Sequence, residues 1–255
     1  MLLANKVAFI TGAGSGIGKA SALLFAQEGA KIVALDTSRE SLDQLVAQIE
    51  ETGGEALAVE ASIADPQQMQ EAVKAAMDKF GQLDIVFANA GINGVWAPIE
   101  ELEPDEWDKT LETNLRGTFL TLKYTFAQMK DRGGAMLVTS SINGTRTFKA
   151  QTIAYSCTKA GQVVLVRSLA VDFATHGVRI NAICPGAIET HINESTDARD
   201  VETLGLPVEF PQGRTPLNKG KANHVAQLAL FLVSDAAMHI SGTEVFIDGA
   251  EALVM

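Results

Sequence analysis

The sequence predicts an α/β fold in which a seven-stranded, mainly parallel sheet lies between two layers of helices. Short apolar runs alternate with longer segments of helical periodicity, which is typical of repeated strand–helix–strand units. The early runs 7–10 and 32–35 are almost continuously apolar, as expected for strands covered on both faces. No linker-like stretch interrupts the 255 residues, so we expect one domain over residues 1–255.

The individual elements follow from this pattern in order. Largely apolar runs predict strands at 7–10, 32–35, 56–59, 85–88, 136–139, 180–183 and 244–247. Helical periodicity predicts helices near 17–28, 39–51, 66–80, 105–130, 155–175 and 222–233. The remaining long segment, about 187–221, mixes Glu, Asp, Pro and Gly. It is either a substrate lid or a surface excursion without a catalytic role.

Charge and hydropathy exclude several classes of function. With 20 Lys and Arg against 31 Asp and Glu, the formal net charge is −11. Binding to a phosphate backbone needs clustered cations, so we expect neither nucleic acid nor an anionic membrane as a partner. No run approaches the roughly 18 apolar residues that a membrane-spanning helix needs.

Cysteine and histidine usage limits the chemistry further. Cys157 and Cys184 are too few for a disulfide framework or a thiolate metal site. The four histidines are scattered and form no HExxH-like pair, so we expect no protein metal site. The N-terminus carries no basic leader, and Thr11 and Gly12 interrupt its apolar stretch. These features favour a reduced, cytoplasmic setting.

A glycine-rich stretch, TGAGSGIG, follows the first predicted strand. A turn of this kind lets backbone N–H groups approach a pyrophosphate at the positive end of the next helix. The glycines Gly12, Gly16 and Gly18 do not match G-x-G-x-x-G, because Ile17 stands where that pattern needs its third glycine. A tight turn with close helix packing would also use glycine, so both interpretations stand at this point.

The second predicted strand ends in Asp36. A carboxylate at this distance from the glycine turn accepts hydrogen bonds from the ribose hydroxyls of an adenosine and repels a 2′-phosphate. The neighbouring Thr37 and Ser38 carry no positive charge, and Arg39 is the nearest cation in the sequence. NAD(H) is therefore favoured over NADP(H). The alternative is that Asp36 merely caps the helix starting near Ser38.

A tyrosine and a lysine lie on one helical face in the sequence YSCTK, because Tyr155 and Lys159 are four residues apart. A phenol has a pKa of about 10 and is a poor base at neutral pH unless a cation stabilises its phenolate. Ser140 and Ser141 follow the strand 136–139, at the sheet edge where ligands bind. Asn114 lies within the helix predicted at 105–130.

These motifs together resemble the short-chain dehydrogenase/reductase family in its single-domain form, over nearly the whole chain. The resemblance rests on TGAGSGIG at 11–18, Asp36, ANAG at 88–91, Asn114, SSING at 140–144, YSCTK at 155–159, PGAIET at 185–190 and SGTEVFIDG at 241–249. It implies a doubly wound Rossmann fold. It also implies hydride transfer between NAD(H) and a secondary alcohol or ketone.

The resemblance also implies a role for each matching residue. Tyr155 would be the general acid/base, Lys159 would lower its pKa and bind the nicotinamide ribose, and Ser141 would hold the substrate oxygen. Asn114 would support a water relay to solvent. The implied cofactor-binding residues are Gly12, Ser15, Gly16, Ile17 and Gly18 at the pyrophosphate, Asp36, Ser62, Ile63, Asn89, Ala90 and Gly91 at the adenosine side, and Pro185, Gly186, Ile188 and Thr190 at the nicotinamide.

The chain departs from the family pattern at three places. Ser62 stands where many relatives carry an Asp that faces the adenine amino group. Tyr155 lies fourteen positions after Ser141, one more than in many relatives, so Ser140 is the alternative catalytic hydroxyl. ANAG begins with Ala88 where relatives often have a second Asn.

Substrate contacts are expected from loops around the predicted active site. The candidates are Asn93, Trp96, Asn143, Arg146, Gln151 and His191, which suit a hydroxylated or acidic substrate such as a sugar, polyol or hydroxy acid. Two other hypotheses remain. One is an NAD(H)-binding regulator without turnover, and the other is a ketone reductase preferring NADPH.

The chain ends in the sequence GAEALVM, directly after a predicted central strand. Because an exposed apolar end is disfavoured, this segment packs either on a partner subunit or within its own subunit. Packing on a partner agrees with the homotetramers common in the family.

Overall fold

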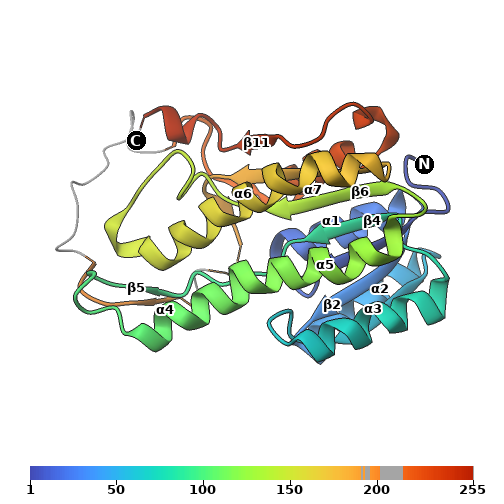
Figure 1. Cartoon of the computed structure of the whole chain (residues 1–255), viewed down its shortest axis with the longest axis horizontal. Helices are drawn as coiled ribbons and strands as arrows, with labels where there is room; N and C mark the ends of the chain where they lie inside the picture. Colours follow the sequence, from blue (N-terminus) through green and yellow to red (C-terminus); the bar gives the residue numbers. More distant parts are fainter. Residues whose placement is uncertain (191, 193–195, 202–214, 255) are drawn as a thin grey trace.

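The computed structural model describes residues 1–190, 192, 196–201 and 215–254. Its centre is a seven-stranded sheet in the order β11-β7-β6-β4-β1-β2-β3, and neighbouring strands run parallel (Figure 1). The strands are β1 Val7–Thr11, β2 Lys31–Asp36, β3 Ala56–Glu60, β4 Ile85–Ala88, β6 Gly134–Thr139, β7 Val178–Pro185 and β11 Glu244–Ile247. All seven predicted strands are confirmed, with small differences at their ends.

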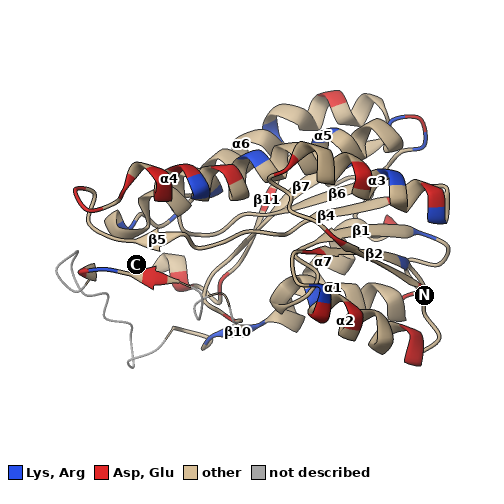
Figure 2. Ribbon diagram, turned by 90° about the horizontal axis from the view of Figure 1, so that it is seen from below, with Lys and Arg blue, Asp and Glu red and all other residues tan. Residues whose placement is uncertain are grey.

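Helices cover both faces of this sheet (Figure 2). One layer consists of α1 Gly16–Gln27, α2 Arg39–Glu51 and α7 Ala222–Val233, and the other contains α3 Pro66–Phe80, α5 Gly117–Met129 and α6 Ile153–Thr175. The side chains of β1 alternate between the two cores: Ala8 and Ile10 pack with the first layer, and Phe9 packs with the second. This period of two explains why the central strands are apolar throughout.

The helix predicted at 105–130 is interrupted. The chain forms α4 Pro104–Leu111, then a π-helical segment Glu112–Arg116, and then α5. The N–H of Gly117 donates to the carbonyl oxygen of Glu112, five residues back. Hydrophobic periodicity did not predict this insertion, because one additional residue in a turn leaves the apolar pattern on both sides intact.

The described parts of the long irregular segment form short strand pairs. β8 Ile188–Glu189 pairs with β10 Gly220–Lys221, and β9 Asp197–Ala198 pairs with β5 Val95–Trp96. β5 and α4 lie beyond the carboxyl ends of the main strands (Figure 1). Residues 202–214 of the predicted lid are outside the described residues, and the lid function remains a prediction.

The strand order reverses direction between β1 and β4. From β1 the sheet continues to β2 and β3 on one side, and from β4 to β6, β7 and β11 on the other. Connections leave in opposite directions at such a switch point, which opens a crevice at the carboxyl ends of the strands. The predicted motifs follow these strand ends, so the fold places them around one crevice.

Candidate active site

A cavity of about 570 Å³ lies at this edge of the sheet and gathers most of the predicted site residues. Its lining includes residues that end or follow each of the strands β1, β2, β3, β4, β6 and β7. The predicted residues that line it are Gly12, Ser15, Gly16, Ile17, Asp36, Ser62, Ile63, Asn89, Ala90, Gly91, Asn93, Trp96, Ser141, Asn143, Tyr155, Lys159, Pro185, Gly186, Ile188 and Thr190.

The glycine turn combines a ligand surface with tight packing. Gly12 has φ +64°, and a Cβ there would lie 2.9 Å from the Cα of Ala90. Gly16 begins α1, and the side chain of the N-cap Ser15 makes no capping hydrogen bond, so the first turn presents its N–H groups to the cavity. Gly18 does not line the cavity, because a Cβ there would lie 1.9 Å from the carbonyl oxygen of Gly12. Close packing thus explains Gly18, and pyrophosphate binding at Gly12 and Gly16 stays a prediction.

Asp36 faces the cavity from the end of β2 and braces the glycine turn. Its Oδ2 accepts a hydrogen bond from the N–H of Gly14 at 2.9 Å, and its Oδ1 accepts one from the N–H of Ser38 at 3.1 Å. The N-cap of α2 is Ser38, whose side chain accepts from the N–H of Ser41, so the helix-cap alternative for Asp36 is wrong. Arg39 is paired along α2 with Asp43, with Nε 2.9 Å from Oδ1.

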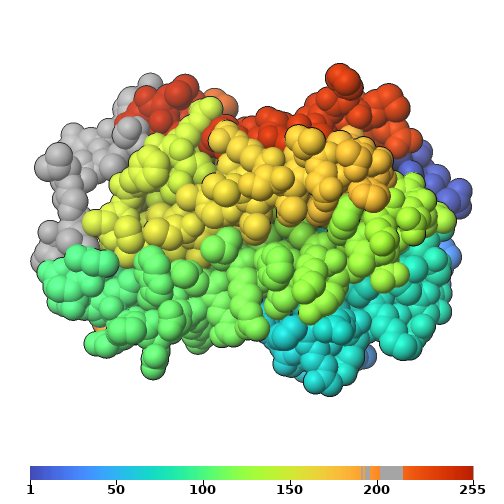
Figure 3. Space-filling view, in the orientation of Figure 1, coloured from blue at the N-terminus to red at the C-terminus, as the bar shows by residue number. Residues whose placement is uncertain are grey.

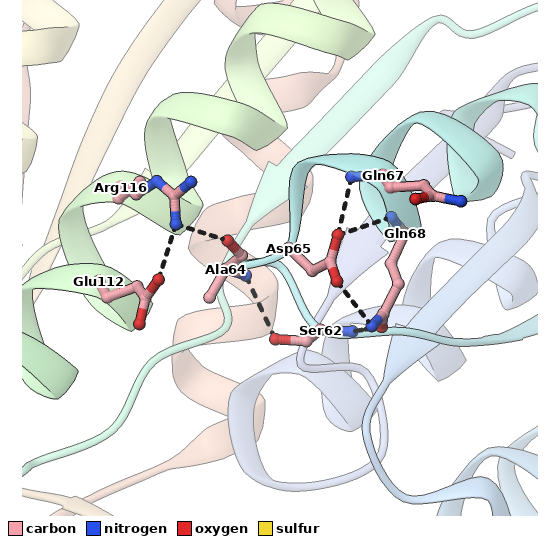
Figure 4. Close-up of polar contacts among 7 residues, drawn as sticks. All are labelled: Ser62, Ala64, Asp65, Gln67, Gln68, Glu112 and Arg116. Atoms are coloured by element: carbon pink, nitrogen blue, oxygen red, sulfur yellow. Dashed lines mark hydrogen bonds and ion pairs between the residues drawn. The ribbon is translucent and has the colours of Figure 1, made fainter.

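Ser62 lines the part of the cavity that the resemblance assigns to the adenosine, and the nearby acid, Asp65, is engaged elsewhere (Figure 4). Asp65 caps α3 by accepting from the N–H groups of Gln67 and Gln68, and these bonds lower the pKa of its carboxyl. The Gln68 side chain accepts from the N–H of Ser62 at 2.8 Å. Arg116 donates to the carbonyl oxygen of Ala64 at 3.1 Å. This wall of the cavity therefore has no carboxylate at position 62, and the Asp65 carboxylate is engaged in capping α3.

Tyr155 meets Ser141 in the cavity. Burial raises the pKa of the Tyr155 phenol, and the nearby Ser141 hydroxyl opposes that rise. The Ser141 hydroxyl donates to the carbonyl oxygen of Pro185 at 3.5 Å and accepts from the N–H of Asn143 at 3.1 Å. The hydroxyl of Ser140 instead donates to the carbonyl oxygen of Lys159 at 2.8 Å and is buried. Because the Ser140 hydroxyl is engaged with Lys159, Ser141 stays the predicted catalytic hydroxyl.

Lys159 lies behind this pair as a buried ammonium. Its side chain donates to the carbonyl oxygen of Thr139 at 2.8 Å, and Nζ lies 5.3 Å from the centre of the Tyr155 ring. Lys159 is 3% exposed, and this burial lowers the pKa of its ammonium to about 8. The family resemblance implies that Lys159 lowers the pKa of Tyr155, whereas in the folded chain burial raises the pKa of Tyr155.

Asn114 is fully buried in the π-helical segment and does not line the cavity. Its side chain exchanges two hydrogen bonds of 2.8 Å with the backbone of Ile92, which itself lines the cavity. The backbone carbonyl oxygen of Asn114 accepts hydrogen bonds from the hydroxyl of Thr118 and from Nε2 of Gln162. The side chain thus fixes the loop that follows β4, and a part in a proton relay remains a prediction.

The part of the cavity predicted to hold the substrate, called here the substrate end, is formed by the segments around β5 and after β6. Asn93, Trp96 and Asn143 line the cavity there. Arg146 does not, because its guanidinium lies 3.6 Å over the ring of Phe246. The carbonyl oxygen of Gln151 accepts from the N–H of Ala97, and its side chain is not part of the lining. His191 lies outside the described residues.

Sequence reasoning missed several polar residues that line the cavity, including Thr139, Thr147, Lys149, Lys219 and Glu251. Thr147 and Lys149 lie between Ser141 and Tyr155, so their position in the chain was a usable signal. Lys219 and Glu251 follow elements far along the chain. No local pattern indicated that they reach this cavity.

Metal and membrane features are not found in the part of the chain that the structure describes. None of its groups of three or more His, Cys, Asp or Glu side chains is arranged to hold a metal ion. None of its helices is long and apolar enough to cross a membrane.

Comparisons with known proteins agree with this geometry. A family model described as enoyl-(acyl carrier protein) reductase matches residues 12–250. A solved structure of a 3-ketoacyl-ACP reductase from Sinorhizobium meliloti 1021 is 48% identical, with a TM-score of 0.93 over 98% of this chain and 100% of the other. Levodione reductase from Leifsonia aquatica is 38% identical over 97% of this chain and 94% of its own length.

A further solved structure bears on the cofactor. It is a 3-ketoacyl-(acyl-carrier-protein) reductase from Brucella melitensis complexed with NADH, 31% identical, with a TM-score of 0.86 over 98% of this chain and 99% of the other. Proteins of this family bind nicotinamide cofactors, and the glycine turn, Asp36 and the cavity fit such a group. The chain therefore belongs to the short-chain dehydrogenase/reductase family of oxidoreductases.

Proposed function

We propose that this protein is an NAD(H)-dependent oxidoreductase that interconverts a secondary alcohol and a ketone, with Tyr155 as the general acid/base. The main support for the proposal is that Tyr155, Ser141 and Lys159 line the same cavity as the glycine turn. A bound nicotinamide cofactor would supply the hydride donor or acceptor.

The residues of the chain would hold the substrate oxygen and move one proton. The Ser141 hydroxyl, which lies 3.5 Å from the carbonyl oxygen of Pro185, would donate to a substrate carbonyl oxygen and orient that oxygen toward the Tyr155 phenol. Because burial raises its pKa, the phenol is protonated at neutral pH and is ready to give its proton to a ketone oxygen. In alcohol oxidation the buried ammonium of Lys159 favours the phenolate, which accepts the proton.

Two residues support the preference for NAD(H). Asp36 presents its carboxylate at the end of β2, where a 2′-phosphate would be repelled. Arg39, the nearest cation in the sequence, is engaged with Asp43. The NADH complex of the Brucella melitensis relative agrees with this proposal for the present chain.

The substrate proposal is a hydroxylated or acidic small molecule, such as a sugar, polyol or hydroxy acid. It is supported by the polar lining of the substrate end, where Asn93, Asn143 and Lys149 lie. The names of the 3-ketoacyl-ACP reductase and of levodione reductase indicate ketone substrates. Ketone reduction is therefore the other direction to assay.

The testing experiment incubates the protein with NAD⁺ or NADP⁺ and a panel of polyols, sugars, secondary alcohols and hydroxy acids. The corresponding ketones are assayed with the reduced cofactors, and absorbance of the reduced nicotinamide is followed. Turnover with NAD(H) supports the proposal. Tight nucleotide binding without turnover on any substrate would favour a non-catalytic regulator, and a preference for NADPH would favour the alternative reductase.

We also propose a cytoplasmic homotetramer. α5 and α6 lie side by side on the face shown in Figure 3. They expose the large apolar side chains Phe119, Val164 and Val171, which are 45%, 61% and 79% exposed. Apolar groups on neighbouring helices suit contact with a second copy of the chain. The mass in solution, measured by light scattering on a sizing column, tests this assembly.

A further inference from the structure

Glu251 is a buried carboxylate in the wall of the cofactor cavity, 7% exposed. It lies in the short 3-10 turn Glu251–Leu253, which follows the last strand of the sheet. Its Oε2 accepts a hydrogen bond of 2.7 Å from the N–H of Ala187. A Cβ on Gly186 would lie 2.6 Å from the same oxygen, so the carboxylate packs directly against the segment after β7.

The turn that carries Glu251 is held in place by Asp248. The two oxygens of the Asp248 carboxylate accept from the N–H groups of Ala250 and Ala252. Ala250 has φ +67°, which turns the chain back toward the sheet. The position of Glu251 is therefore fixed by the backbone and not only by the choice of its side-chain rotamer.

The charge of Glu251 has no cationic partner in the described chain. No Lys, Arg or His of the described residues lies within ion-pair distance of its carboxylate, and Lys159 and Lys219 line the same cavity without pairing with it. Its one hydrogen bond is neutral, from the N–H of Ala187. A carboxyl group buried in a cavity wall without a cationic partner is unfavourable, so its position points to a cation that binds in the cavity.

We propose that Glu251 discriminates between the redox states of the cofactor by favouring the oxidised form. This inference rests on the proposed NAD(H) function. The segment Pro185, Gly186 and Ile188, which the family resemblance assigns to the nicotinamide, adjoins Glu251 through Gly186 and Ala187. An oxidised nicotinamide ring carries a positive charge that the reduced ring lacks. A nearby carboxylate therefore stabilises NAD⁺ more than NADH.

The experiment measures dissociation constants for NAD⁺ and NADH separately, by calorimetry without substrate, for wild type and for Glu251→Gln. Glutamine keeps an acceptor for the N–H of Ala187 and removes the charge. We expect the ratio Kd(NAD⁺)/Kd(NADH) to rise by about fivefold, as for charges several ångströms apart in a partly solvated cavity. Glu251→Asp should keep the wild-type ratio more closely than Glu251→Gln does, and circular dichroism checks folding.

A matched control is Glu50→Gln, which removes the same charge from an exposed site on α2. Its ratio should equal that of wild type. An unchanged ratio in Glu251→Gln, with both constants either constant or weakened equally, would overturn the inference and leave a structural role. If Glu251→Gln does not fold, a wild-type ratio in a folded Glu251→Ala would overturn it in the same way. Wild type that binds neither nucleotide would overturn the proposed NAD(H) function as well.

Discussion

The cofactor end and the substrate end of the cavity are built in different ways. At the cofactor end, the glycine turn and Asp36 come from the first βαβ unit, and Gly14 bonds directly to Asp36. At the substrate end, β5 pairs with β9, about a hundred residues later in the chain, and Ala97 bonds to Gln151. One end is a local structure and the other is assembled from distant segments.

The two ends of the cavity are therefore constrained by different features of the chain. The cofactor end depends on backbone conformation, since its glycines have positive φ or leave no room for a Cβ. The substrate end depends on side chains that touch only after the sheet has formed. Changes at the cofactor end should therefore weaken nucleotide binding. Changes at Tyr155, where the two ends meet, should lower turnover.

The largest expected effect is a loss of turnover on replacement of Tyr155. Replacement of Tyr155 by Phe removes the hydroxyl that exchanges the proton and leaves the ring, so turnover should fall by about a thousandfold. The dissociation constant for the nucleotide should stay within about twofold of wild type. Steady-state assays and calorimetry measure the two quantities. Retained turnover would mean that another group is the acid/base.

A smaller effect is expected from breaking the cofactor end alone. In Gly18→Ala, the new Cβ would lie 1.9 Å from the Gly12 carbonyl oxygen and 2.8 Å from Nδ2 of Asn89. The turn must shift, so nucleotide binding should weaken by about thirtyfold and the free energy of unfolding should fall by about 2 kcal/mol.

The matched control for this change is Gly81→Ala at the end of α3, where φ is +72° and no atom lies within 4 Å of the added Cβ. It should cost about 1 kcal/mol of stability from its left-handed backbone and leave nucleotide binding unchanged. Equal effects of the two variants on binding would contradict a local role for the turn.

The charge at the end of β2 can be tested without disturbing the turn. Asp36→Asn keeps a side-chain oxygen that can accept from Gly14 and removes the repulsion of a 2′-phosphate. The preference for NAD⁺ over NADP⁺ should fall by about tenfold. Binding constants for both nucleotides measure it, and Glu40→Gln, at an exposed position on α2, serves as the control. A preference equal to that of wild type would reject the role of Asp36.

The smallest effect concerns the buried ammonium behind Tyr155. The pKa of Lys159 is lowered from 10.5 to about 8 by burial, so between these values the unfolded chain binds more protons than the folded chain. Stability therefore rises with pH in this window, and the rise should be about 1 kcal/mol between about pH 7.5 and about pH 9.5.

Denaturant unfolding of wild type and Lys159→Met at both pH values measures this effect, which should be missing in the variant. The range stays below about pH 10, where the raised pKa of Tyr155 acts in the opposite direction. Parallel pH dependence in the two proteins would contradict a lowered pKa for Lys159.

The sequence by itself determined the sheet and the two helix layers, and it predicted the residues of the cofactor end. Apolar periodicity located each strand of the main sheet, because the central strands are buried on both faces and tolerate few polar residues. The glycine turn and Asp36 could be interpreted locally, since a backbone conformation that excludes a Cβ leaves a mark in a few consecutive residues. The pairing of Tyr155 with Lys159 could also be predicted locally, because residues four apart lie on one face of a helix.

Only the tertiary structure decided the rest. It turned the Ser140 hydroxyl toward the carbonyl oxygen of Lys159 and Arg146 onto Phe246. It also placed Asn114 in a π-helical segment and brought Glu251 against Gly186. Each of these depends on a contact between elements that are distant in the chain or on the direction of one side chain. Neither leaves a periodic signal, because the free energy that fixes such contacts arises from packing across the whole sheet.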